Sequence, residues 1–216
     1  MYSRLFLLLL IKNPMKTILN AFNTSTAGVE NNFYFSFLAL NFGNQRPFKN
    51  DVILPVLDLS QNKMTATFLN SFSLDKVNEY GNSIRRHFLN DMVIVYETYS
   101  SQMFSSHKNG QTLIKPETIN NRHLGADKFE QLSDIYTSDE LTFLSQLRKL
   151  RNSIVHYNGN YAETQPLDYT FGTEIYNSAG KIGQGISIKF DNILWIFEEL
   201  KTIVNSGNKK YFLNYP

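Results

Sequence analysis

An arginine and a histidine lie five positions apart in the segment RNSIVHYNGN, residues 151–160. Histidine is the side chain that both takes up and releases a proton near neutral pH. The arginine guanidinium stays protonated, and its planar donor fork suits the charge that develops on phosphate oxygens during phosphodiester cleavage. The residue types therefore favour RNA cleavage, with His156 as general acid and base and Arg151 stabilising the transition state.

Helix geometry constrains how this pair could act. At about 100° per residue, Arg151 and His156 diverge by roughly 140° around an ideal helix, whereas Asn152 and His156 share one face. A second copy of the same helix, facing the first across a two-fold axis, would place two arginines and two histidines around one cleft. We therefore predict a composite site in a homodimer. One His156 would activate the ribose 2′-hydroxyl and the other would protonate the leaving 5′-oxygen, a scheme that requires no metal and no cofactor.

Four neighbouring residues could support this chemistry. Asn152 could orient His156 or contact RNA, and Tyr157 could stack on a base. Arg148 and Lys149 could extend a basic rim for the RNA backbone. Each has a plainer interpretation: Asn152 and the two cations as solvated helix residues, and Tyr157 as a core aromatic. Arg151 and His156 could likewise be cations that interact with the last carbonyls of an exposed helix end.

The segment LRKLRNSIVHYNGN resembles the signature of the HEPN ribonucleases, in which an arginine and a polar residue precede a histidine after four to six intervening positions. Arg151, Asn152 and His156 occupy these positions. The resemblance covers about residues 137–160. It implies an antiparallel helical bundle, dimerisation that builds the active cleft, and metal-independent endoribonuclease activity. Such proteins commonly serve as toxins of toxin–antitoxin modules, with an antitoxin protein as partner, or as anti-phage defence effectors.

Two competing hypotheses remain open. A HEPN-like module could bind RNA, nucleotide or a partner protein without catalysis. A helical scaffold could also carry the arginine and histidine by accident.

The composition is that of one globular unit. The chain has 216 residues, of which 42% are hydrophobic and 14% aromatic, enough for one substantial core. The absence of cysteine excludes disulfides, cysteine-ligated metals and thiol catalysis, and a cytoplasmic location is the default expectation. A formal net charge of +2 is too small to attract polyanions by itself, so an RNA site would need a local concentration of cations.

The first residues carry an apolar run, Leu5 to Ile11, that ends at Lys12 and Pro14. A spanning helix needs about 20 apolar residues, so no membrane association is expected. The run is either a terminal strand or the product of an early start codon, with Met15 as the true beginning. Residues 1–14 are therefore an uncertain extension, and residues 15–216 are expected to form a single HEPN-like helical domain.

Apolar spacing predicts the elements along the chain. A helix after Met15 should be followed by an extended segment near 52–57, a long helix over 73–104 with a break near Gly81, a polar connection over 105–125 and a short helix within 126–136. The clearest helix starts at a capping box of Thr137 and Glu140, carries leucines at spacings of three, and stops at Asn158 and Gly159.

The C-terminal part should hold two β arms at 169–190 around the glycine-rich SAGKIGQG, then a helix over 191–204 capped by Asp191 or Asn192 and closed by Gly207. SAGKIGQG lacks the full phosphate-loop pattern, so a hairpin turn is favoured. Arg85, Arg86 and His87 in IRRHF are adjacent and are expected to splay across faces as solvated residues. The expected fold is mainly α, with a small β-hairpin insertion.

Overall fold

The structure is a computed structural model, and it describes residues 14–44, 53–58, 63–68, 74–108, 126–132 and 134–215. The apolar run from Leu5 to Ile11 lies outside the described residues, and so do residues 109–125 of the connection predicted over 105–125. Residues 105–108 belong to a helix instead, so the long helix predicted over 73–104 ends four residues later than expected.

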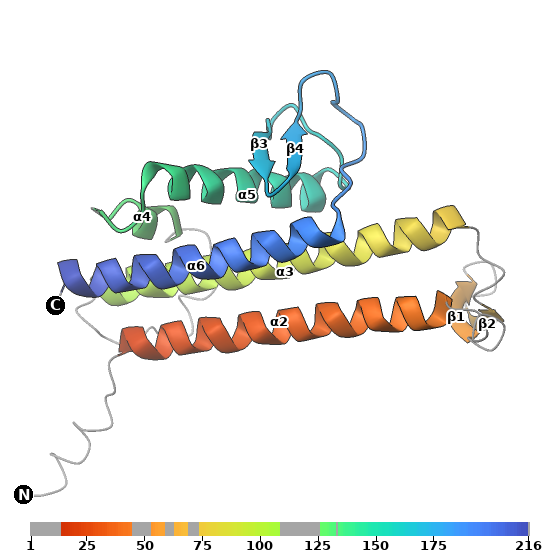
Figure 1. Cartoon of the computed structure of the whole chain (residues 1–216), viewed down its shortest axis with the longest axis horizontal. Coiled ribbons are helices and arrows are strands. Elements are labelled where there is room, and N and C mark those ends of the chain that lie inside the picture. Colours follow the sequence, from red (N-terminus) through yellow and green to blue (C-terminus); the bar gives the residue numbers. More distant parts are fainter. Residues whose placement is uncertain are drawn as a thin grey trace, which may run out of the picture.

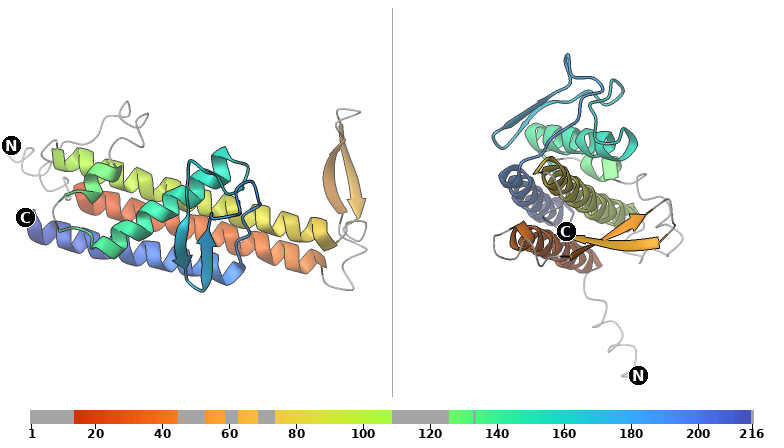
Figure 2. Two further views of the ribbon diagram at one scale, coloured as in Figure 1. Left: turned by 90° about the horizontal axis from the view of Figure 1, so that it is seen from above. Right: turned by 90° about the vertical axis from the view of Figure 1, so that its right-hand side faces the viewer.

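The described residues form five helices and two small antiparallel sheets, which confirms the mainly α prediction. Three long helices, α2 (Pro14–Asn44), α3 (Leu74–Lys108) and α6 (Phe190–Asn214), run side by side along the molecule (Figure 1). Seen end-on, α5 (Ser138–His156) lies on one side of this group, above α3 and α6 (Figure 2). The short α4 (Ala126–Glu130) precedes α5, and α3 runs unbroken through Gly81.

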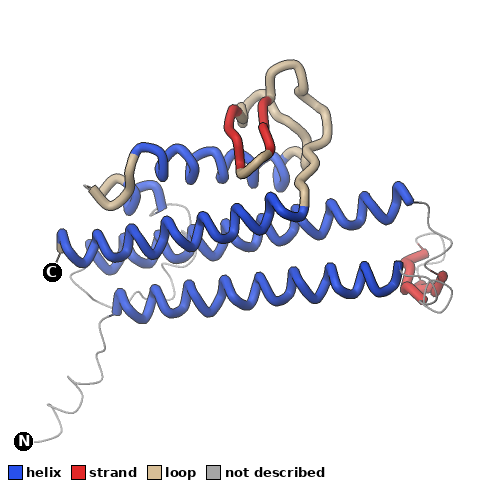
Figure 3. Tube along the Cα trace, in the orientation of Figure 1, coloured by secondary structure: helices blue, strands red, loops and turns tan. Residues whose placement is uncertain are grey.

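Strands β1 (Ile53–Asp58) and β2 (Lys63–Phe68) pair in antiparallel register at the end of α2, in agreement with the extended segment expected there. Strands β3 (Asp168–Phe171) and β4 (Glu174–Asn177) form the second hairpin, which lies beside α5 (Figure 3).

An aromatic cluster joins the three long helices. The ring of Phe33 on α2 is fully buried and lies 5.0 Å from the ring of Phe88 on α3. On α6, the rings of Phe190 and Phe197 lie 5.3 and 5.7 Å from the same Phe33 ring. Large buried rings of this kind contribute much of the hydrophobic stabilisation of a core. This cluster therefore stabilises the packing of α2, α3 and α6, the helices beside which α5 lies.

Helix α5 starts and ends as its sequence predicts. The Thr137 backbone N–H donates to Glu140 Oε2 at 2.7 Å, and the Glu140 N–H donates to Thr137 Oγ1 at 3.3 Å. The leucine face is buried, including Leu144, Leu147 and Leu150. After the helix, Asn158 and Gly159 adopt positive φ angles of 54° and 74°, which end the helical path.

The predicted position of the hairpin turn was wrong. The turn between the paired strands lies at Gly172, whose φ of 59° suits a tight left-handed turn, and SAGKIGQG follows the second strand. The pairing ends at Ser178, which exchanges hydrogen bonds with Leu167 in both directions: the Ser178 N–H donates to the Leu167 carbonyl at 2.9 Å, and the Leu167 N–H donates to Ser178 Oγ at 2.8 Å. The SAGKIGQG segment then forms a loop that pairs with Asn160 and Tyr161, just after the end of α5.

The predicted bounds of the last helix were also wrong. Helix α6 continues beyond Gly207 to Asn214, and its N-cap is Lys189. Gly207 is buried inside the helix, where an added Cβ would collide with the ring of Tyr136. Asn192 is buried as well and donates to the Tyr176 hydroxyl at 3.1 Å. It therefore hydrogen bonds within the core and does not cap the helix.

Candidate functional site

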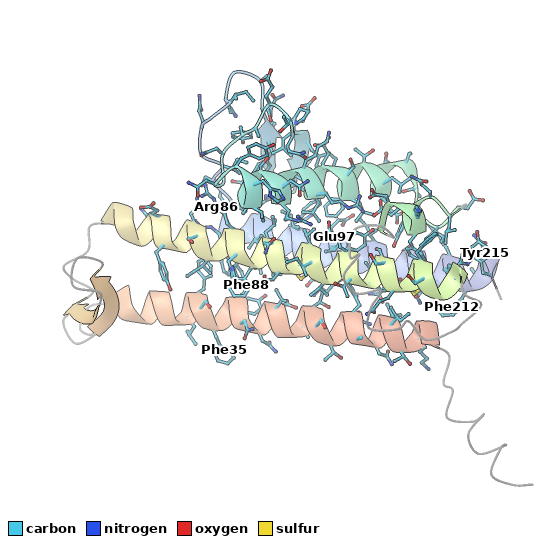
Figure 4. The ribbon with its side chains drawn as sticks, turned by 180° about the vertical axis from the view of Figure 1, so that it is seen from behind. Phe35, Arg86, Phe88, Glu97, Phe212 and Tyr215 are labelled. Atoms are coloured by element: carbon cyan, nitrogen blue, oxygen red, sulfur yellow. The ribbon has the colours of Figure 1, made fainter. Side chains whose placement is uncertain are left out.

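Arg151 is buried at the interface between α5 and α3. Its Nη2 donates to Oε2 of Glu97 at 2.5 Å, and the side chains are only 9% and 6% exposed, respectively. Glu97 lies on α3 beneath α5 (Figure 4). The arginine of the predicted catalytic pair is therefore already engaged by a carboxylate in the folded chain.

Arg148, three residues earlier on α5, belongs to the same network of ion pairs. Its Nη1 lies 2.8 Å from Asp127 Oδ1 and its Nε 3.9 Å from Glu97 Oε1, and its Nη2 donates to Glu130. Burial raises the pKa of Tyr96 well above its usual range, so its hydroxyl stays protonated and donates to the same Glu130. Arg148 therefore lies among acidic groups of α3 and α4 and not on an open basic rim, whereas Lys149 is partly exposed.

His156 lies at the last position of α5 and is exposed to solvent. The residues on either side, Val155 and Tyr157, are exposed by 47% and 38%. Arg151 points into the α3 interface while His156 faces outward, so the two side chains diverge as helix geometry requires. One chain presents the histidine at its surface and keeps the arginine inside.

Asn152 and Tyr157, two of the four residues expected to support the chemistry, contact the segment that follows α5. The Asn152 side-chain amide donates to Gln165 Oε1 at 3.4 Å, and the Tyr157 hydroxyl hydrogen bonds with Thr164. Residues 161–165 therefore fold back along the end of the helix. Asn152 and Tyr157 lie at the same helix end as His156, but their polar groups form hydrogen bonds with this segment.

Sequence reasoning missed Arg86, which was expected to be solvated. Arg86 is half-buried on α3 and donates to the carbonyls of Gly159 and Ile186, at 3.1 and 2.5 Å. Figure 4 places it where α3 passes the end of α5. Its partners are 73 and 100 residues away in the chain, so no local spacing could have indicated the contact.

The described residues hold no group of three or more histidine or acidic side chains arranged to bind a metal ion. His107 Nδ1 lies 2.9 Å from the Tyr211 hydroxyl, within hydrogen-bonding distance. None of the helices in the part of the chain that the structure describes is long and apolar enough to cross a membrane.

The described part of the chain is a mainly helical bundle in which Arg151 and His156 lie on opposite sides of the C-terminal end of α5. Comparisons with protein-family models, with curated proteins and with solved structures gave no match for the chain.

Proposed function

We propose that the chain is a metal-independent endoribonuclease of the HEPN type that acts as a cytoplasmic homodimer, as a toxin of a toxin–antitoxin module or as an anti-phage defence effector. The observation that carries the proposal is the exposure of His156 at the C-terminal end of α5, a helix whose sequence has the Arg-x4-His pattern. A histidine in this position is free to approach RNA, and a second copy could meet it across the exposed Val155 and Tyr157.

The proposed reaction is transfer of the RNA phosphodiester to the neighbouring 2′-hydroxyl. One His156 takes the 2′ proton as the 2′-oxygen attacks phosphorus, and the partner's His156 gives a proton to the 5′-oxygen as the P–O5′ bond breaks. The products are a 2′,3′-cyclic phosphate and a 5′-hydroxyl. Direct stabilisation of the phosphate by Arg151 requires this side chain to exchange Glu97 for RNA, because its guanidinium is buried against that carboxylate.

Incubation of the purified protein with RNA in EDTA tests the proposal. We expect cleavage with 2′,3′-cyclic phosphate ends, and its loss in His156→Gln. His87→Gln is the matched control, because His87 is also an exposed helical histidine, with its side chain 72% exposed. Arg151→Lys, which keeps the charge beside Glu97, is preferable to Arg151→Ala, which would leave Glu97 buried beside an empty space. Cleavage that is absent, or equal in wild type and His156→Gln, contradicts the proposal.

A second candidate function is a non-catalytic HEPN-like module that binds RNA, nucleotide or a partner protein. The burial of Arg151 against Glu97 favours it, because this pairing withholds the cation that catalysis would use. Retention of labelled RNA without any cyclic phosphate product would support this candidate. Growth arrest on expression, abolished by His156→Gln, would support the toxin instead, and its relief by a co-expressed neighbouring gene would identify an antitoxin.

A further inference from the structure

Three segments that are distant in sequence meet at the end of α5. Arg86 of α3 donates from Nη2 to the Gly159 carbonyl at 3.1 Å, and from Nε and Nη2 to the Ile186 carbonyl at 3.2 and 2.5 Å. The Ile186 N–H in turn donates to the Gly159 carbonyl at 2.7 Å. One guanidinium therefore joins α3 to the residues after α5 and to the loop after β4.

Gly159 connects this junction to the last turn of α5. Its N–H lies 3.1 and 3.2 Å from the carbonyls of Ser153 and Ile154, which are C-terminal helix groups that need a partner. Gly159 is itself buried, and a Cβ at this position would collide with the guanidinium of Arg86. Arg86 therefore packs against the backbone that caps the helix, three residues beyond His156.

Asn82, one turn before Arg86 on α3, also contacts the loop after β4. Its side-chain amide lies 3.4 Å from the Ile186 carbonyl, and its Oδ1 accepts from the Ile188 N–H at 3.3 Å. Burial lowers the pKa of Arg86, yet a guanidinium keeps its charge at any physiological pH. A fixed cation beside the C-terminal carbonyls of α5 is electrostatically favourable.

We propose that Arg86 is a positioning residue that fixes the end of α5, and with it the direction in which His156 faces the RNA. This inference rests on the proposed ribonuclease function. Arg86 would act through Gly159 and touch no reacting atom. Small displacements of a catalytic group are costly, since a shift of about 1 Å can lower a rate about 100-fold.

The test compares Arg86→Gln with Arg85→Gln. The two variants remove the same charge from adjacent residues, but the Arg85 guanidinium lies toward α2, 5.7 Å from the Phe37 ring centroid. We expect kcat for RNA cleavage to fall at least about tenfold in Arg86→Gln, with KM within about twofold of wild type, and both to be retained in Arg85→Gln. Arg86→Lys, which keeps the charge and loses the fork, should be intermediate.

Amide hydrogen exchange supplies a readout that does not depend on activity. In Arg86→Gln the amides of Gly159 and Ile186 should exchange at least about tenfold faster, while that of Leu89 in the buried middle of α3 keeps its wild-type rate. Equal acceleration at all three sites would show a global loss of stability and overturn the inference. An active wild type with unchanged kcat in Arg86→Gln would overturn it as well. A wild type that cleaves no RNA would contradict the proposed function itself, and with it the positioning role that Arg86 has in that function.

Discussion

Arg151 on α5 and Glu97 on α3 form a hydrogen-bonded ion pair of 2.5 Å whose side chains are both more than nine-tenths buried. Glu97 also lies 3.9 Å from Arg148, so one carboxylate faces two cations. The desolvation of buried charges is costly, and such a pair is tolerated because each member compensates the other. Arg151, the arginine of the Arg-x4-His pattern, therefore also links α5 to α3.

Loss of one member of this pair should be strongly destabilising. We expect Arg151→Leu and Glu97→Leu each to lower the free energy of unfolding by about 3–5 kcal/mol, because each removes one side of this buried, hydrogen-bonded ion pair. The double variant should cost less than the sum of the two single variants, since it removes both charges. Urea unfolding of the four proteins measures this coupling.

Lys149→Leu is the control for these variants, because Lys149 is a partly exposed cation beside the same interface. Its effect should stay within about 0.5 kcal/mol. Single variants whose free energies simply add would show that the pair contributes no coupling.

The sequence was sufficient for α5 because its signals are local. Thr137 and Glu140 cap each other across three residues, and the buried leucines repeat at helical spacing. Divergence of Arg151 from His156 follows from helix geometry alone. Such features depend on residues within a few turns of one another, and no other part of the fold is needed to infer them.

Long-range contacts determined what the sequence could not reveal. The partner of Arg151 lies 54 residues away and the partners of Arg86 lie 73 and 100 residues away. The glycines of SAGKIGQG suggested a turn, but this loop is shaped by pairing with residues 159–161, whereas the true turn uses Gly172. Gly207 suggested a helix end because glycine is common just after helices. Its actual role is to leave room for the Tyr136 ring, a contact that the local sequence does not reveal.

Gly207 should behave in the opposite way from Gly28, although both lie inside helices. Gly28→Ala should stabilise the protein by up to about 1 kcal/mol, because alanine is the better helix former and nothing lies within 4 Å of the new Cβ. Gly207→Ala should destabilise it by about 1–3 kcal/mol, because its Cβ would overlap the Tyr136 ring. Thermal unfolding of both variants decides the matter, and a stabilised Gly207→Ala would disprove the close packing.

The buried tyrosines should make the protein sensitive to alkaline pH. Burial raises the pKa values of Tyr96, Tyr99, Tyr136 and Tyr176 above the usual value. In the unfolded chain each tyrosine loses its proton near pH 10, while the folded protein keeps it. The stabilisation is therefore complete below about pH 10, and above it the free energy of unfolding falls by about 1.4 kcal/mol per pH unit for each tyrosine.

Tyr99→Phe tests this expectation. The variant leaves Asn208 Oδ1, which accepts from the Tyr99 hydroxyl at 3.3 Å, without that donor, so it should be about 1–2 kcal/mol less stable at pH 7. Between pH 10 and 11, however, the free energy of unfolding should fall less steeply for the variant than for wild type. The difference between the two slopes should be about 1.4 kcal/mol per pH unit, the contribution of one tyrosine. Urea unfolding at pH 8, 10 and 11 gives both quantities, and parallel pH curves for the two proteins would contradict the assignment.

Gly159 and Gly180 separate backbone strain from contact with Arg86. Both have positive φ, 74° and 69°, so Gly→Ala at either position should cost about 1–2 kcal/mol from the backbone alone. Nothing lies within 4 Å of a Cβ at Gly180, whereas a Cβ at Gly159 would collide with the Arg86 guanidinium. Gly159→Ala should therefore cost at least about 1 kcal/mol more than Gly180→Ala in urea unfolding. In the Arg86→Gln background, where the guanidinium is gone, this excess should shrink. An excess that persists there would mean that Arg86 does not pack against the end of α5.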